Sequence, residues 1–94
     1  MKQVTFIVPS SVWIAGGYLD AAYGRHAEVQ LQFRQQGRGK QVIVTAPVRI
    51  AVDIYKYLRD RAGPQYGDAY ARRAAGRAAE GLRPLLLAEG EQLL

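Results

Sequence analysis

The sequence contains no cysteine, a single histidine and two serines. Without cysteine the chain has no disulfide framework, no thiolate nucleophile and no thiolate metal ligand. His26 alone excludes a multi-histidine metal cluster and argues against a His-dependent triad. Ser10 and Ser11 suit the N-cap of a helix better than the role of nucleophile. We therefore expect no enzyme, no catalytic residue, no metal site and no cofactor.

Long hydrophobic runs are also missing, since none approaches the roughly 18 residues that a membrane-spanning helix needs. The N-terminal stretch carries one lysine and a strand-like run ending at Pro9, unlike a secretory signal peptide. The eight carboxylates are scattered along the sequence. No two of them form a motif that would give the pair different pKa values, as general acid–base catalysis requires. These absences predict a cytoplasmic chain with no membrane partner.

The remaining composition is that of one small basic domain. Of the 94 residues, 49% are hydrophobic, so residues 1–94 can form a single core. A domain of this size often gains stability by dimerising, which leads us to expect a homodimer. The net charge is +5, and arginine, the side chain best suited to planar contacts with phosphate, supplies most of the cations. Nucleic acid is therefore the first partner to consider, and a merely soluble basic domain is the alternative.

Periodicity predicts an α+β fold with a small antiparallel sheet of two to three strands and helices packed on one face. The clearest feature is a central hairpin over residues 27–46, in which Val29, Leu31 and Phe33 alternate with polar residues. Strand 2–9 carries apolar residues on both faces, which predicts a buried strand. The predicted elements are strands 2–9, 27–36 and 40–46, helices 11–23, 48–62 and 67–83, and a C-terminal tail 84–94 that begins at Pro84.

Two details of this assignment carry specific expectations. Helix 11–23 contains Gly16 and Gly17, so a strand over 12–15 that turns at the glycines is the competing interpretation. Asp68 precedes the last helix as a plausible N-cap.

Most of the cations fall at the hairpin tip and on the last two helices, and they form the candidate nucleic-acid site. The cations at the hairpin tip have two interpretations. They contact a phosphate backbone, or they belong to an ordinary solvated turn. Among the tyrosines, Tyr57 and Tyr66 are candidate interface residues near the Arg59–Arg61 cluster, whereas Tyr55 and Tyr70 are assigned to the rim of the core. The full candidate set is Arg34, Arg38, Lys40, Gln41, Thr45, Arg59, Arg61, Arg72, Arg73 and Arg77.

Residues 41–83 resemble the ribbon-helix-helix family of dimeric DNA-binding proteins. The resemblance rests on the strand 41–45, the helical segment 50–58 and the segment 69–75. It implies that Gln41, Ile43 and Thr45 face the bases from a ribbon shared between two subunits, and that the turn at Gly67-Asp68 approaches a phosphate. Residues 28–35 are a competing partner for the same strand within one chain.

Together these observations predict a non-enzymatic nucleic-acid-binding protein, a dimeric DNA-binding regulator that uses Arg-rich helices and a basic hairpin tip. The alternative is a small phage-type inhibitor or adaptor, anti-CRISPR-like or antitoxin-like, that binds a larger nucleic-acid-processing protein complex. Tyrosine and arginine dominate protein-binding hot spots, so the composition suits that role as well. A third interpretation is a subunit of a homo-oligomer held by the Ala-rich helix and the leucine-rich tail.

Overall fold

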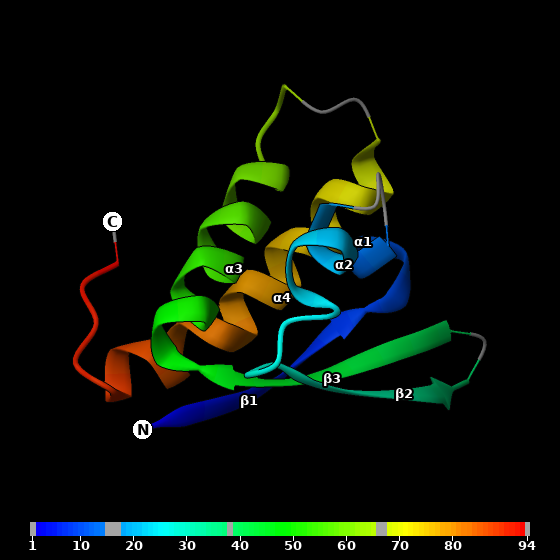
Figure 1. The fold of residues 1–94 in the computed structure, drawn as a ribbon. Coiled ribbons are helices and arrows are strands. Elements are labelled where there is room, and N and C mark those ends of the chain that lie inside the picture. Colours follow the sequence, from blue (N-terminus) through cyan, green and yellow to red (C-terminus); the bar gives the residue numbers. More distant parts are fainter. Residues whose placement is uncertain (1, 15–17, 38, 66–67, 94) are drawn as a thin grey trace.

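Three antiparallel strands form one sheet, and helices cover a single face of it (Figure 1). The computed structural model describes residues 2–14, 18–37, 39–65 and 68–93. This arrangement confirms the predicted α+β fold class. The elements are β1 (Gln3–Pro9), α1 (Ser10–Ile14), α2 (Tyr18–Tyr23), β2 (Gln30–Gln36), β3 (Gly39–Pro47), α3 (Val48–Arg61) and α4 (Ala69–Ala88).

The strand order is β1-β3-β2, so β3 lies at the centre of the sheet. Val42 of β3 lies opposite Phe33 of β2 on one side and Val8 of β1 on the other. The predicted hairpin therefore forms within the chain. With both of its edges occupied, β3 has no free edge for a second copy, and a shared ribbon through residues 41–45 is not available in this fold.

Alternation along the strands separates a covered face from an open face. On β3, Val42, Val44 and Ala46 are buried beneath the helices. On β1, the expectation of burial on both faces is wrong, because Ile7 is 42% exposed. Ile7 pairs across the open face with Ile43, and this cross-strand contact accommodates both β-branched side chains without a helix above them.

The helices α3 and α4 supply most of the covering layer. Ile54 and Leu58 of α3 are fully buried, as their four-residue spacing predicts. Small residues on α4 let the two helices approach closely, and an added Cβ at Gly76 would meet the Ala62 Cβ at 3.5 Å. Asp68 is the predicted N-cap of α4, since its carboxylate accepts hydrogen bonds from the backbone N–H groups of Tyr70 and Ala71 at 3.0 and 3.2 Å.

The described residues of the predicted helix 11–23 belong to two short helices, α1 and α2, and not to one. Val12 lies in α1, so the alternative strand is also wrong, and Gly16-Gly17 fall outside the described residues. Trp13 and Leu19 are both fully buried, one on each helix. Two separate segments can thus each turn an apolar side chain into the core.

Pro84 does not end the last helix, which continues to Ala88. The residues 84–88 are therefore helical and not part of a tail. Leu82 and Leu86 are fully buried on either side of the proline, so ending the helix there would remove Leu86 from the core. The carbonyl of Glu80, which loses its helical donor, belongs to an exposed residue that water can reach. No helix within the described ranges is long and apolar enough to cross a membrane.

Candidate nucleic-acid interface

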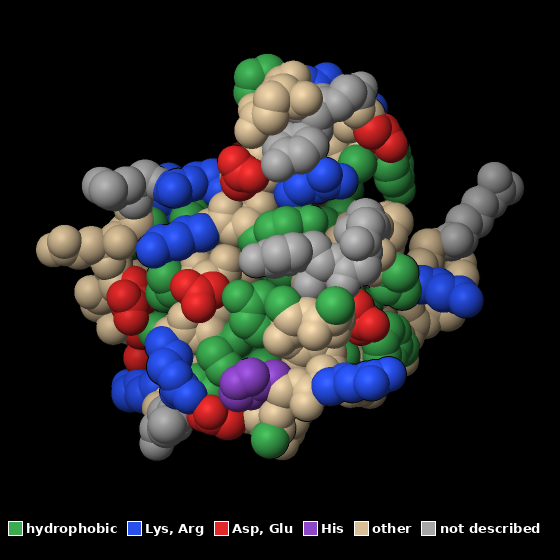
Figure 2. All heavy atoms as spheres, turned by 45° about the horizontal axis from the view of Figure 1, so that its top comes forward, with side chains coloured by type: hydrophobic (Ala, Val, Ile, Leu, Met, Phe, Trp, Pro, Cys, Tyr) green, Lys and Arg blue, Asp and Glu red, His purple; other side chains and the backbone are tan. Residues whose placement is uncertain are grey.

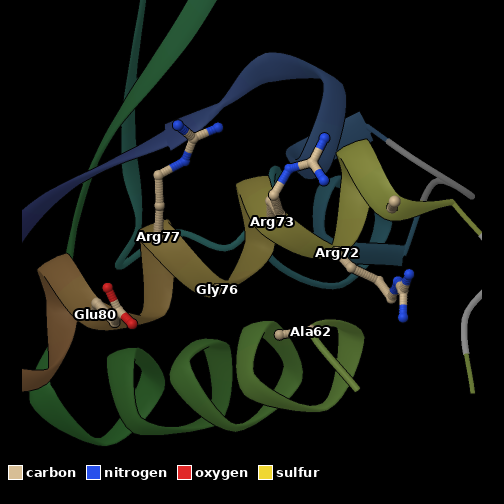
Figure 3. Close-up of a pocket in the computed structure, with 7 residues that line it drawn as sticks. Ala62, Arg72, Arg73, Gly76, Arg77 and Glu80 are labelled. Atoms are coloured by element: carbon tan, nitrogen blue, oxygen red, sulfur yellow. The ribbon is translucent and has the colours of Figure 1, made fainter. Parts of the chain in front are cut away.

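The helix α4 directs two of its three predicted arginines to the same side. Figure 3 shows Arg73 and Arg77 projecting away from α3, whereas Arg72 points in a different direction. Both are exposed, and their four-residue spacing places them one turn apart. Arg72 is half-buried, and its Nε has no hydrogen-bond partner among the described residues. Arg73 and Arg77 are thus the arginines of α4 that present a shared cationic surface.

Arg77 faces the beginning of β3 across an open hollow of about 500 Å³, here called the α4–β3 groove. Lys40 and Gln41 line the groove from the strand. Its apolar lining includes Ile7 of β1 and Ala74 of α4. The fold therefore brings predicted cations from the hairpin and from α4 to opposite sides of one concave surface, although they lie far apart in the sequence.

Tyr70 also lines the α4–β3 groove, and it is 63% exposed. Its assignment to the core rim was wrong. Tyr70 shares a helical stripe with Ala74 and Ala78, which are buried, so spacing alone favours burial. The residues around the Tyr70 ring, however, line the open α4–β3 groove, so the ring stays exposed. Only the position of the first turn of α4 relative to the strands could have identified this exposed aromatic side chain.

Two of the other tyrosines, Tyr55 and Tyr57, lie in or against the core and not beside Tyr70. Tyr55 is 5% exposed and lies in the core itself, deeper than the predicted place at the core rim. Tyr57 is half-buried and packs against the core. Tyr66 lies outside the described residues, as does the hairpin-tip residue Arg38.

At the hairpin, Arg34 donates hydrogen bonds from Nε and Nη2 to Oε1 of Gln41, at 3.3 and 3.1 Å. The two residues lie directly opposite one another on β2 and β3. Gln41 also shares the open face of the sheet with Thr45, whose hydroxyl lies 3.0 Å from that of Thr5. Gln41 therefore lines the groove and is held by Arg34 from the neighbouring strand, whereas Thr45 lies further along β3, outside the groove.

The cations of α3 lie elsewhere. The Arg59 guanidinium lies over the ring of Tyr55, 5.5 Å from its centroid. Arg59 lines a separate hollow with Lys56 and Leu93, and that hollow shares no residue with the α4–β3 groove. Arg61 is half-buried. The structure thus divides the predicted basic set and places the α3 members outside the candidate site.

Lys40 and Arg77 at the groove, and Arg73 beside it on α4, form no ion pair among the described residues, whereas Arg49 pairs with Glu28 at 2.6 Å. Glu80 lines a hollow beside Arg73 and Arg77 without pairing with either (Figure 3). On the face turned forward in Figure 2, by contrast, cationic and acidic side chains are interspersed. Unpaired cations on both sides of a concave surface favour an anionic ligand.

The described residues contain no group of three or more metal-ligating side chains. Comparison of the chain with protein-family models, curated proteins and solved structures gives no match in any of the three. The arrangement itself provides guanidinium and ammonium donors for phosphate, a tyrosine ring for stacking, and an amide group beside them.

Proposed function

We propose that this chain is a non-enzymatic nucleic-acid-binding protein, a dimeric DNA-binding regulator that binds through the α4–β3 groove. The observation that carries the proposal is the placement of Lys40 and Arg77, which form no ion pair among the described residues, on opposite sides of one groove that the exposed Tyr70 ring also lines. Phosphates along a nucleic-acid backbone supply the repeated negative charge that such a surface attracts.

In this proposal the cationic residues contact phosphate and the tyrosine contacts a base. Lys40, Arg73 and Arg77 bind phosphate oxygens, and the two arginines follow the backbone along one side of α4. Tyr70 stacks on a base, which requires the base to be unpaired or at an opened end. Contacts of this kind depend mainly on charge and on the base face, so we expect limited discrimination between base sequences.

The double substitution R73E/R77E tests the proposal. Fluorescence anisotropy with labelled duplex and single-stranded DNA, and with single-stranded RNA, would measure affinity across a salt series. We expect the unmodified protein to release nucleic acid as salt rises. The variant should bind more weakly and reduce the slope of log affinity against log salt by about 1.8 for duplex or about 1.4 for a single strand, because two phosphate contacts are lost.

The matched control is K56E/R59E, which makes the same change in net charge on α3, outside the groove. It should retain most of the affinity of the unmodified protein. Equal losses in the two variants would show that overall charge, and not the groove, drives binding. If the unmodified protein binds no nucleic acid at low salt, the proposed function is wrong.

The second candidate is the inhibitor or adaptor that binds a larger nucleic-acid-processing protein complex. The open sheet face favours it, since exposed Ile7 and half-buried Ile43 lie there among glutamine and threonine side chains, with Arg34 as the charged residue of β2 on that face. A mixed apolar and mostly uncharged polar surface suits a protein better than a polyanion. Absence of nucleic-acid binding at low salt, with a folded protein, would favour this candidate.

A further inference from the structure

The strand β2 forms one edge of the sheet, and its outer backbone N–H and C=O groups have no strand partner among the described residues. Natural proteins usually protect such an edge with lysine, proline, a bulge or a covering element. The sequence of β2, QLQFRQQ, contains no lysine, no proline and no carboxylate. It pairs with β3, but no helix of the described part of the chain packs extensively against it. The edge is therefore uncharged apart from Arg34, and uncovered.

Apolar side chains are exposed beside this edge. Phe33 of β2 is 58% exposed, and Ile14 of α1 is 53% exposed. Both line a hollow of about 400 Å³, together with Ser10, Arg34, Gln35 and Lys40. The largest exposed aromatic side chain of the sheet thus lies on the unprotected strand, as expected for a contact surface and not for a solvated edge.

The opposite edge of the sheet, formed by β1, is protected against pairing and carries no exposed aromatic side chain among the described residues. β1 ends at Pro9, which has no backbone N–H to donate to a further strand. Arg77 of α4 lines the groove beside Ile7 and Pro9, and Figure 3 shows its side chain extending from α4 toward this strand. The helix α4 packs along β1, whereas no helix among the described residues packs extensively against β2. Only β2 among the described strands combines a free edge with an exposed aromatic residue.

We propose that the outer edge of β2 pairs antiparallel with β2 of a second copy, about a two-fold axis at Phe33. In this register Phe33 packs against Phe33 of the second copy, and Gln32 lies opposite Arg34 of the second copy. The Gln32 amide oxygen can accept a hydrogen bond from the Arg34 guanidinium. A register centred on Arg34 would instead oppose two like charges, which is destabilising. The strand is therefore complementary to itself, which identifies a second copy as the occupant.

This pairing joins two sheets into one of six strands, with both helical layers on the same side. It leaves Arg73 and Arg77 uncovered, because they lie on α4 beside the other edge of the sheet. Dimerisation thus does not depend on the proposed nucleic-acid binding.

The substitution F33K tests the dimer, because it replaces the aromatic pair at the axis with two like charges. Sedimentation equilibrium over a range of protein concentrations should show a dimer for the unmodified chain. It should show a dissociation constant raised at least roughly tenfold for F33K. The matched control is Y70K, which changes an equally exposed aromatic residue away from β2 and should leave the dissociation constant unchanged.

A second measurement keeps the test decisive if F33K fails to fold, as judged by circular dichroism. The cysteine-free chain allows single cysteines at 33 and at 70, and a short bismaleimide should cross-link F33C between copies much faster than Y70C. A chain that stays monomeric at all concentrations overturns the proposal. This holds even if the edge of β2 then proves to bind a different protein. A dimer that F33K leaves intact, or equal cross-linking of the two cysteine variants, does so as well.

Discussion

At the scale of single residues, the hydrogen bond from Trp13 to Asp20 joins α1 to α2. The Trp13 indole Nε1 donates to the Asp20 Oδ1 at 3.0 Å, and the Trp13 side chain is fully buried. D20A removes the acceptor and leaves a buried donor without a partner. We expect the free energy of unfolding to fall by about 1–3 kcal/mol.

The measurement is urea unfolding followed by the fluorescence of Trp13, the only tryptophan. Asp53 provides the control, because it is exposed and has no hydrogen bond or ion pair among the described residues. D53A should change stability by less than about 0.5 kcal/mol. A loss for D20A no larger than that for D53A would show that the indole finds another acceptor or water.

At the scale of elements, Pro84 tests whether local preference or burial decides the end of α4. Proline inside a helix removes a backbone donor and disfavours the preceding turn, so the sequence predicts a helix that ends before it. The helix continues because Leu86 reaches the core only in helical geometry. Tertiary burial of this kind is invisible to a rule that considers neighbours in sequence, and the predicted tail was wrong for that reason.

P84A should therefore stabilise the protein, by up to about 3 kcal/mol, because alanine restores the helical N–H and removes the ring clash. Urea unfolding provides the measurement. G81A is a useful comparison, since Gly81 is an exposed helical residue whose added Cβ would meet nothing within 4 Å; it should add about 1 kcal/mol. Should P84A leave stability unchanged while G81A raises it, the helix would end before residue 84 in solution.

At the scale of the whole molecule, the strands, α3 and the N-cap of α4 could be predicted because their signals are local. Alternating apolar residues define the hairpin, and four-residue spacing defines the buried stripe of α3. The candidate site could be predicted only as a list of cations. That Arg77 and Lys40 meet across a groove while Arg59 does not depends on how α4 packs beside β1, which no local pattern in the sequence encodes.

The same whole-molecule packing makes the end of the chain part of a single core. Leu86 is fully buried, whereas the adjacent Leu87 is 46% exposed. L86A should lower the free energy of unfolding by about 2–5 kcal/mol, a large fraction of the roughly 5–15 kcal/mol typical of a small domain. L87A makes the same chemical change at the surface and should cost far less.

Thermal melts followed by circular dichroism compare the two variants directly. A large loss for L86A alone would mean that truncation after Arg83 unfolds the monomer, so a truncated chain could not be used to test assembly through the leucine-rich end. Equal and small losses would instead place the last turn of α4 outside the core. Leu85 and Leu87, which are exposed, would then be the residues to test for contacts between copies.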